Sequence, residues 1–334
     1  MNSHPSLSSL RRWALAGALC WVALPGWAQR PARRAQSQTI LFVGNSFFHG
    51  AFQPVLGYNA AAITDENFRP DRAGQRRRQY EHEEGPWGGI PGIFKKLTDE
   101  AGLHYDVHLE AISGQTLKFH YDSALAVIRQ PKWDKVVMHD YSTGPVPTRH
   151  GGQPARFFEY ATKLEQAVHT ANPAAQVYLY QTWARADLTY PTGKDYSGLP
   201  LDSMTRDLHT AYYQEATRDG HFAGVAPAGD AWLRAVQQGV AMPNPYAPEA
   251  GKVDLWGRDH YHPSTYGAYL NACVLLAEIT GYDPRKLGGT EQAAAALSIA
   301  PPVAVKLQRL AYEQVQAAEK SSKSTPKAKR NSRS

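Results

Sequence analysis

One serine, one aspartate and one histidine in this 334-residue chain have the spacing that nucleophilic catalysis requires. Ser46 directly follows an apolar run, and Asp259 stands three residues before His262 near the other end of the chain. A serine hydroxyl becomes a good nucleophile when an imidazole removes its proton, and a carboxylate can fix the tautomer of that imidazole. We therefore expect the three side chains to act as nucleophile, orienting acid and base if the fold brings them together.

The elements that must position these residues follow the pattern of a parallel sheet. Short apolar runs alternate with helical periods, which favours a sheet covered by helices on both faces. The predicted strands are residues 39–43, 105–112, 135–139, 176–181 and 222–226, and the predicted helices are residues 92–101, 117–129, 157–171, 203–218 and 263–280. Because ligands of such sheets bind beyond the carboxyl ends of the strands, the polar residues that follow each strand are expected at one edge.

Three blocks of the sequence resemble those of SGNH hydrolases, also called GDSL-like hydrolases. The first is ILFVGNSFF, in which a Gly-Asn-Ser turn would present the nucleophile; the others are AISGQTLKFH and DHYHP, the latter an Asp-x-x-His block. The blocks occur in the family's order and together cover most of residues 39–280. The chain is most similar to the exported branch whose first block begins with Gly-Asn-Ser-Phe, and three ordered blocks are far more specific than one.

This resemblance implies a flavodoxin-like three-layer α/β/α sandwich with a central, mostly parallel five-stranded sheet. It also implies a serine ester hydrolase that forms an acyl-enzyme, with Ser46, Asp259 and His262 as its catalytic residues. The backbone N–H groups of Ser46 and Gly114 would stabilise the oxyanion that forms during attack on an ester.

The chain departs from the family pattern at the third oxyanion donor. The family has an asparagine after the third strand, whereas this chain reads Met-His-Asp-Tyr-Ser at residues 138–142. The resemblance therefore leaves three alternatives: His139 replaces the asparagine, the Tyr141 hydroxyl replaces it, or the oxyanion hole has two donors only.

The expected substrate is a small acyl group carried by a carbohydrate or a similar polar ester. Asn45, Trp183 and Tyr141 are the candidate substrate-binding residues, because aromatic rings can stack on the apolar faces of sugars. No metal or organic cofactor and no nucleic acid partner is expected.

Other interpretations of the same residues stay open. Ser46 could be a helix N-cap, for which serine is common. Asp259, His260 and His262 could bind a metal ion with His139 and Asp140, which would indicate a metal-dependent phosphoesterase. A non-catalytic envelope protein could use the same pocket to bind a glycan or an ester without turnover.

The ends of the chain differ from its middle. Residues 1–28 have two arginines, then an apolar run and small residues, which predicts a removed signal peptide, and therefore a periplasmic or secreted protein without stable membrane insertion. Residues 29–38 are a predicted linker, residues 39–288 the hydrolase domain with an inserted loop at 57–90, and residues 289–318 a C-terminal helical extension. Removal of the signal would leave Cys273 as the only cysteine, which excludes an intramolecular disulfide.

Charge is also concentrated at the ends. The chain has a net charge of +6, of which +2 lies in residues 1–28 and +5 in residues 319–334, so the remainder has a net charge of −1. Residues 319–334 are rich in Lys and Ser and are predicted to be a disordered basic tail, available to contact anionic surfaces. The nearly neutral body does not have the basic patch that nucleic-acid binding requires.

Overall fold

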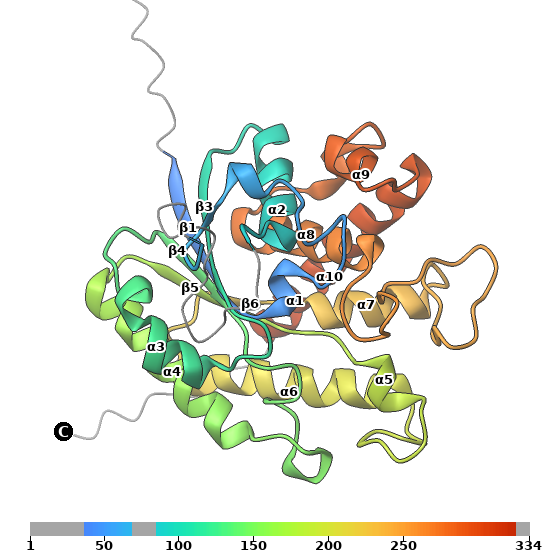
Figure 1. The fold of residues 1–334 in the computed structure, drawn as a ribbon, viewed down its shortest axis with the longest axis horizontal. Helices are drawn as coiled ribbons and strands as arrows, with labels where there is room; N and C mark the ends of the chain where they lie inside the picture. The colour runs from blue at the N-terminus through green and yellow to red at the C-terminus, as the bar shows by residue number, and fades with distance from the viewer. Residues whose placement is uncertain (1–36, 69–84, 325–334) are drawn as a thin grey trace, which may run out of the picture. The chain divides into compact units, whose positions relative to one another are not determined.

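The centre of the protein is a parallel sheet. The computed structural model describes residues 37–68 and 85–324, and the predicted signal peptide lies outside them. The sheet has six strands in the order β2-β3-β1-β4-β5-β6 (Figure 1). Their bounds are β1 Gln38–Gly44, β2 Thr64–Asp65, β3 Tyr105–Ala111, β4 Lys135–Met138, β5 Gln176–Tyr180 and β6 Gly224–Ala226. All the paired strands run parallel, so their carboxyl ends meet at one edge.

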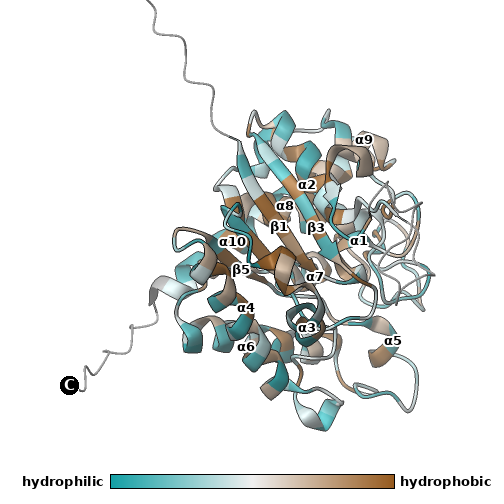
Figure 2. Cartoon of the chain, turned by 60° about the vertical axis from the view of Figure 1, so that its left-hand side comes forward, coloured by the Kyte–Doolittle hydropathy of each residue, from teal (hydrophilic) through white to brown (hydrophobic). Residues whose placement is uncertain are grey.

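Strand β1 lies between two separate hydrophobic cores, one on each face of the sheet. Successive side chains of a strand point to opposite faces, and in β1 Ile40 and Phe42 join one core while Leu41 and Val43 join the other. All four side chains are fully buried. Figure 2 shows the hydrophobic colouring along β1 and β5 between helices of mixed colouring. The prediction that the apolar run at residues 39–43 forms a strand covered on both faces is thus confirmed.

Helices cover both faces of the sheet. Those on the face of Ile40 and Phe42 are α2 Gly89–Glu100, α7 Ala228–Gln237, α8 Thr265–Thr280 and α10 Pro301–Ser324. Those on the opposite face are α3 Leu117–Ile128, α4 Pro154–Ala171 and α6 Leu201–Asp219. Shorter elements are α1 Ser46–His49, α5 Ala186–Thr189 and α9 Gln292–Ala296, with 3₁₀ turns η1 Ala60–Ala62, η4 Thr148–His150 and η5 Pro284–Leu287. The predicted three-layer α/β class is therefore confirmed.

The predicted number of five strands is wrong, because β2 adds a sixth strand at the edge. It lies within residues 57–90, the predicted inserted loop, and Asp65 pairs with Leu109 of β3. The Asp65 carboxylate accepts hydrogen bonds at 3.0 Å from the backbone N–H groups of Asn67 and Trp87, which hold the segment in place. A two-residue strand has no apolar period, so the sequence carries no signal for it. Residues 69–84 of the predicted loop lie outside the described residues.

The C-terminal extension is part of a core. Helix α10 packs against α8 and α7, and Leu307, Leu310 and Ala311 are fully buried in that contact. The helix continues to Ser324, which lies within the range 319–334 that was predicted to be disordered; residues 325–334 lie outside the described residues. Within residues 37–68 and 85–324, no helix combines the length and the apolar character that crossing a membrane requires.

Leu310→Ala is expected to destabilise the protein by about 2–5 kcal/mol, because it leaves a cavity between α10 and α8. Val305→Ala on the same helix is the matched control: Val305 is 44% exposed, and its truncation should change the free energy of unfolding by about 0.5 kcal/mol or less. Urea denaturation measures both values. Equal, small losses for the two variants would show that α10 is not part of the folded core.

Candidate active site

Ser46 lies where the central strand β1 ends and the short helix α1 begins. The preceding residue, Asn45, is the N-cap of α1, and its Oδ1 accepts a hydrogen bond of 3.1 Å from the Phe47 N–H. The Nδ2 of Asn45 donates to the Gln115 carbonyl at 2.9 Å and to the Asp140 carbonyl at 3.4 Å. Asn45 is 2% exposed. This buried amide therefore ties the Ser46 turn to the chain that follows β3 and β4.

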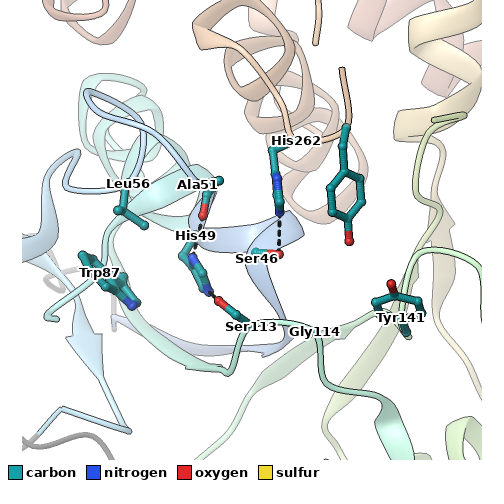
Figure 3. A pocket seen from close by; sticks show the side chains of 11 residues that line it. Ser46, His49, Ala51, Leu56, Trp87, Ser113, Gly114, Tyr141 and His262 are labelled. Carbon is teal, nitrogen blue, oxygen red and sulfur yellow. Dashed lines mark hydrogen bonds between the residues drawn. The ribbon is translucent and has the colours of Figure 1, made fainter. Parts of the chain in front are cut away.

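The structure brings Ser46, His262 and Asp259 into one hydrogen-bonded chain. His262 Nε2 lies 2.8 Å from Ser46 Oγ (Figure 3). On the other side of the ring, His262 Nδ1 lies 2.6 Å from Asp259 Oδ2. Because a carboxylate can only accept, Nδ1 carries the proton and Nε2 is free to accept the serine hydroxyl proton. The three side chains have the connectivity of a serine nucleophile, its base and an orienting acid.

The histidine is placed by a tight loop before α8. Asp259 Oδ1 accepts hydrogen bonds from the backbone N–H groups of Tyr261 and His262, at 3.1 and 3.0 Å. The Gly257 N–H donates to the His262 carbonyl at 2.6 Å, and the Ser264 side chain then caps α8. Because Asp259 and His262 are three residues apart, the chain between them forms one turn around the Asp259 carboxylate.

The Asp259 carboxylate is held in its charged form. Burial by itself would raise its pKa, but the hydrogen bonds from the His262 ring and from the backbone N–H groups outweigh burial and lower the pKa to about 2. At neutral pH the carboxylate is therefore ionised and can stabilise an imidazolium on His262.

A cavity of about 560 Å³ opens in front of Ser46. Its lining residues are Ser46, His49, Gly50, Ala51, Leu56, Trp87, Ser113, Gly114, Tyr141, Tyr261 and His262. Gly114 has a φ of +70°, a conformation that glycine adopts without strain. Within the described residues, neither the Ser46 N–H nor the Gly114 N–H donates a backbone hydrogen bond. Both predicted oxyanion donors thus belong to residues that line the cavity next to the serine hydroxyl.

His139 does not face this cavity, and its predicted role as an oxyanion donor is wrong. Its ring is fully buried and packs edge-on against Phe48. Nδ1 donates to the Asp140 carbonyl at 2.8 Å, and Nε2 accepts from the Asn45 N–H at 3.5 Å, so no ring N–H is left to donate. Complete burial also lowers the pKa of His139 to about 3, which keeps the ring neutral. Tyr141, the other candidate, does line the cavity.

Trp183 is a core residue, so its predicted contact with substrate is wrong. The side chain is fully buried, and its ring stacks on Phe47 with 4.1 Å between centroids and on Trp232 with 4.6 Å. The indole N–H donates to the Tyr261 carbonyl at 3.1 Å, directly beside His262. Trp183 therefore supports the two segments that hold Ser46 and His262.

The sequence interpretation missed two aromatic residues of the cavity wall. Trp87 is partly exposed there, and the His49 ring stacks on it with 6.0 Å between centroids. His49 Nε2 lies 3.3 Å from Ser113 Oγ, next to Gly114 (Figure 3). Trp87 follows a segment without a regular period, and His49 stands one turn beyond Ser46. His49 directly follows the Gly-Asn-Ser block, and this position was the sequence signal that could have identified it as a site residue.

The predicted metal set is not assembled in the described part of the chain. Asp140 is buried and accepts a hydrogen bond of 2.8 Å from the Leu117 N–H, while both ring nitrogens of His139 have protein partners. In residues 37–68 and 85–324, the one group with metal-binding geometry is Glu165, Asp219 and His221, which is far along the chain from Ser46. The site around Ser46 therefore has the arrangement of a serine nucleophile.

Comparisons with known proteins agree on the fold. Neither a family model nor a curated protein matches the chain. Among solved structures, a DUF4886 family protein from Bacteroides uniformis aligns at 16% identity with a TM-score of 0.55, over 84% of this chain and 95% of that chain. At this identity the likeness shows the fold alone.

Two further solved structures align more loosely. One is Axe2, an acetylxylan esterase from Geobacillus stearothermophilus, at 16% identity and a TM-score of 0.45, over 74% of this chain and 96% of that chain. The other is the esterase EstA from Pseudoalteromonas, at 14% identity and a TM-score of 0.42, over 73% of this chain and 98% of that chain. The α/β fold of this chain is therefore shared with the DUF4886 family protein. The resemblance to SGNH and GDSL-like hydrolases rests on the three sequence blocks.

Asp259→Asn is expected to change the stability of the protein at acid pH. The folded-state pKa of about 2 lies below the ordinary value of 3.8, so the wild-type carboxylate stabilises the folded state above that value and loses this contribution as the pH falls toward 2. The difference in unfolding free energy between wild type and Asp259→Asn should therefore shrink between about pH 4 and pH 2. Urea denaturation across that range measures it, and a constant difference would contradict the assignment.

Proposed function

We propose that this protein is a serine ester hydrolase that works through an acyl-enzyme. The observation that carries the proposal is the continuous hydrogen-bonded chain from Ser46 through His262 to Asp259, at the edge of a cavity. The family resemblance of the three sequence blocks supports the same reaction class.

The proposed reaction uses each group at a defined atom. Ser46 Oγ attacks the ester carbonyl carbon while His262 Nε2 takes the hydroxyl proton, and the N–H groups of Ser46 and Gly114 stabilise the resulting oxyanion. Collapse of this intermediate breaks the bond to the alcohol, which receives the proton from His262. A water molecule then gives a proton to His262 and attacks the acyl-enzyme, which releases the acid and restores Ser46.

Tyr141 is the proposed third oxyanion donor. It follows strand β4, where the family has its asparagine, and it lines the cavity with Ser46 and Gly114. The neighbouring Tyr261 contacts the Tyr141 side chain and lies under the Arg185 guanidinium, with 3.7 Å from the guanidinium carbon to the ring centroid. A phenol held in such a pair can present its O–H to the oxyanion without reorganisation.

The proposed substrate is a small acyl group on a carbohydrate or similar polar alcohol. The partly exposed Trp87 ring in the cavity wall supports this choice, because sugar C–H faces pack well on indole. We also propose that the protein is exported, on the strength of the N-terminal sequence pattern; the basic C-terminal residues are available for anionic surfaces.

A second candidate function is binding without turnover. It is favoured by the missing family asparagine, together with the orientation of His139 away from the cavity. In that case the cavity would hold a glycan or an ester while the oxyanion remained too poorly stabilised for hydrolysis.

Ser46→Ala is expected to abolish both reaction with a fluorophosphonate probe and hydrolysis of short aryl esters. Removal of the nucleophile should lower kcat by about 10⁴-fold or more. Labelling followed by mass spectrometry measures the first effect, and an acetyl, butyryl and longer-chain ester series measures the second. Ser113→Ala, which alters another hydroxyl of the same cavity, is the control and should keep the label on Ser46.

Three outcomes would reject the hydrolase. Full turnover in Ser46→Ala would show that another group is the nucleophile, and an unlabelled wild-type protein that still binds a sugar would favour the binding function. Loss of turnover on chelation, in a wild-type protein that stays folded, would favour the metal-dependent reaction.

Tyr141→Phe tests the third donor while keeping the ring in place. Loss of one oxyanion donor should lower kcat by about 10²–10³-fold, with little change in KM, because the hydroxyl acts on the oxyanion and not on the bound ester. Tyr261→Phe is the matched control, with a smaller expected loss in kcat. Unchanged kcat in Tyr141→Phe would indicate an oxyanion hole with two donors.

A further inference from the structure

A second cluster of titratable side chains lies at the opposite edge of the sheet from Ser46. It surrounds a cavity of about 480 Å³ next to Pro173, shortly before the amino end of strand β5. Two segments contribute to it: the C-terminal half of α4 supplies Glu165 and His169, while the end of α6 and the turn that follows supply Asp219 and His221. None of these residues takes part in the proposed ester hydrolysis.

The donor atoms of this cluster converge. Single ligand atoms of Glu165, Asp219 and His221 all lie within 4.8 Å of one another. Asp219 ends α6 and His221 follows its C-cap, Gly220, whose φ of +77° turns the chain back toward α4. Glu165 and His169 are four residues apart on α4, which puts both side chains on the same face of the helix.

His169 lies beside the cluster and contacts Glu165. Its Nε2 lies 2.8 Å from the Ala175 carbonyl oxygen, and a carbonyl can only accept, so Nε2 carries the proton. Its Nδ1 contacts Glu165 Oε1. Partners of this kind orient the ligands of metal sites.

The two carboxylates also lack a permanent cation. The side chains of Glu165 and Asp219 are each 2% exposed. Within the described residues, no lysine or arginine forms an ion pair with either of them, whereas the nearby buried Glu215 has Arg218 at 2.7 Å. Two buried carboxylates this close repel each other unless a cation or a proton lies between them.

We propose that Glu165, Asp219 and His221 bind a divalent transition-metal ion, with Zn²⁺ as the best fit. Mixed imidazole and carboxylate donors suit Zn²⁺, whereas Mg²⁺ and Ca²⁺ prefer oxygen donors alone. Three protein ligands leave a fourth position that a water molecule can fill. The ion would join the ends of α4 and α6 and stabilise the folded state without taking part in ester turnover.

The test uses the untagged full-length chain, freed of metal with a chelator and then desalted. Isothermal titration with Zn²⁺ alone should show a single strong site, and thermal unfolding should show a rise in Tm with Zn²⁺ but not with equimolar Mg²⁺. His221→Ala should weaken Zn²⁺ binding by about 100-fold or more, since even loss of an outer partner costs about 10–100-fold. Its side chain is 60% exposed, so the variant should fold. Glu165→Gln should give the same loss.

His209→Ala is the matched control. His209 forms a similar His–Asp pair, 2.8 Å from Asp230, on the same helix α6, but without a second carboxylate beside it. This variant should keep wild-type Zn²⁺ affinity. The proposal is wrong if wild type shows no Zn²⁺-dependent rise in Tm, if His221→Ala binds Zn²⁺ as tightly as wild type, or if His209→Ala loses as much affinity as His221→Ala.

Discussion

The hydrogen bond between Ser46 and His262 is the interaction on which the proposed chemistry depends. Its two residues are 216 positions apart, so the 2.8 Å contact depends on the tertiary fold and not on local sequence. Strand β1 fixes one side, because it is buried on both faces and paired with β3 and β4. The loop before α8 fixes the other, because Asp259 binds both the ring and the backbone of His262. Displacement of either β1 or the loop before α8 would separate the Ser46 hydroxyl from His262 Nε2.

Two histidines near the serine turn, His139 and His262, show how burial decides the chemical role of a side chain. His139 lies behind the turn, fully buried, with both ring nitrogens engaged by protein groups. His139 therefore has a structural role in holding the serine turn. The Asn45 amide has a similar role, because it connects the segments that follow β1, β3 and β4. His262 lies at the cavity instead, and its ring is free to exchange a proton with Ser46. The same residue type is structural in one place and reactive in the other because only one of them meets solvent and substrate.

Much of the architecture follows from local sequence patterns. Short, mostly apolar runs predicted the five longer strands, because strands of a parallel sheet are covered on both faces and favour apolar side chains. Strand β2 escaped prediction, since a two-residue strand is specified by the free edge of β3 and by the Asp65 carboxylate, not by its own composition. The amphipathic helix α7 was also missed, because its alanine-rich segment follows β6 without a clear start signal.

The sequence by itself predicted which three side chains the structure brings together. Ser46 follows an apolar run that predicted a strand buried on both faces, and the Asp-x-x-His spacing makes a turn that joins carboxylate and imidazole. Tertiary packing alone decided which other side chains face the cavity. Trp183 and His139 follow strands as expected of site residues, yet their rings turn into the core. Trp87 reaches the cavity from a segment without a distinctive pattern, and His49 reaches it from the turn that directly follows the Gly-Asn-Ser block. Residue type and strand position limit where a backbone passes, but the direction of a side chain depends on the space that its distant neighbours leave.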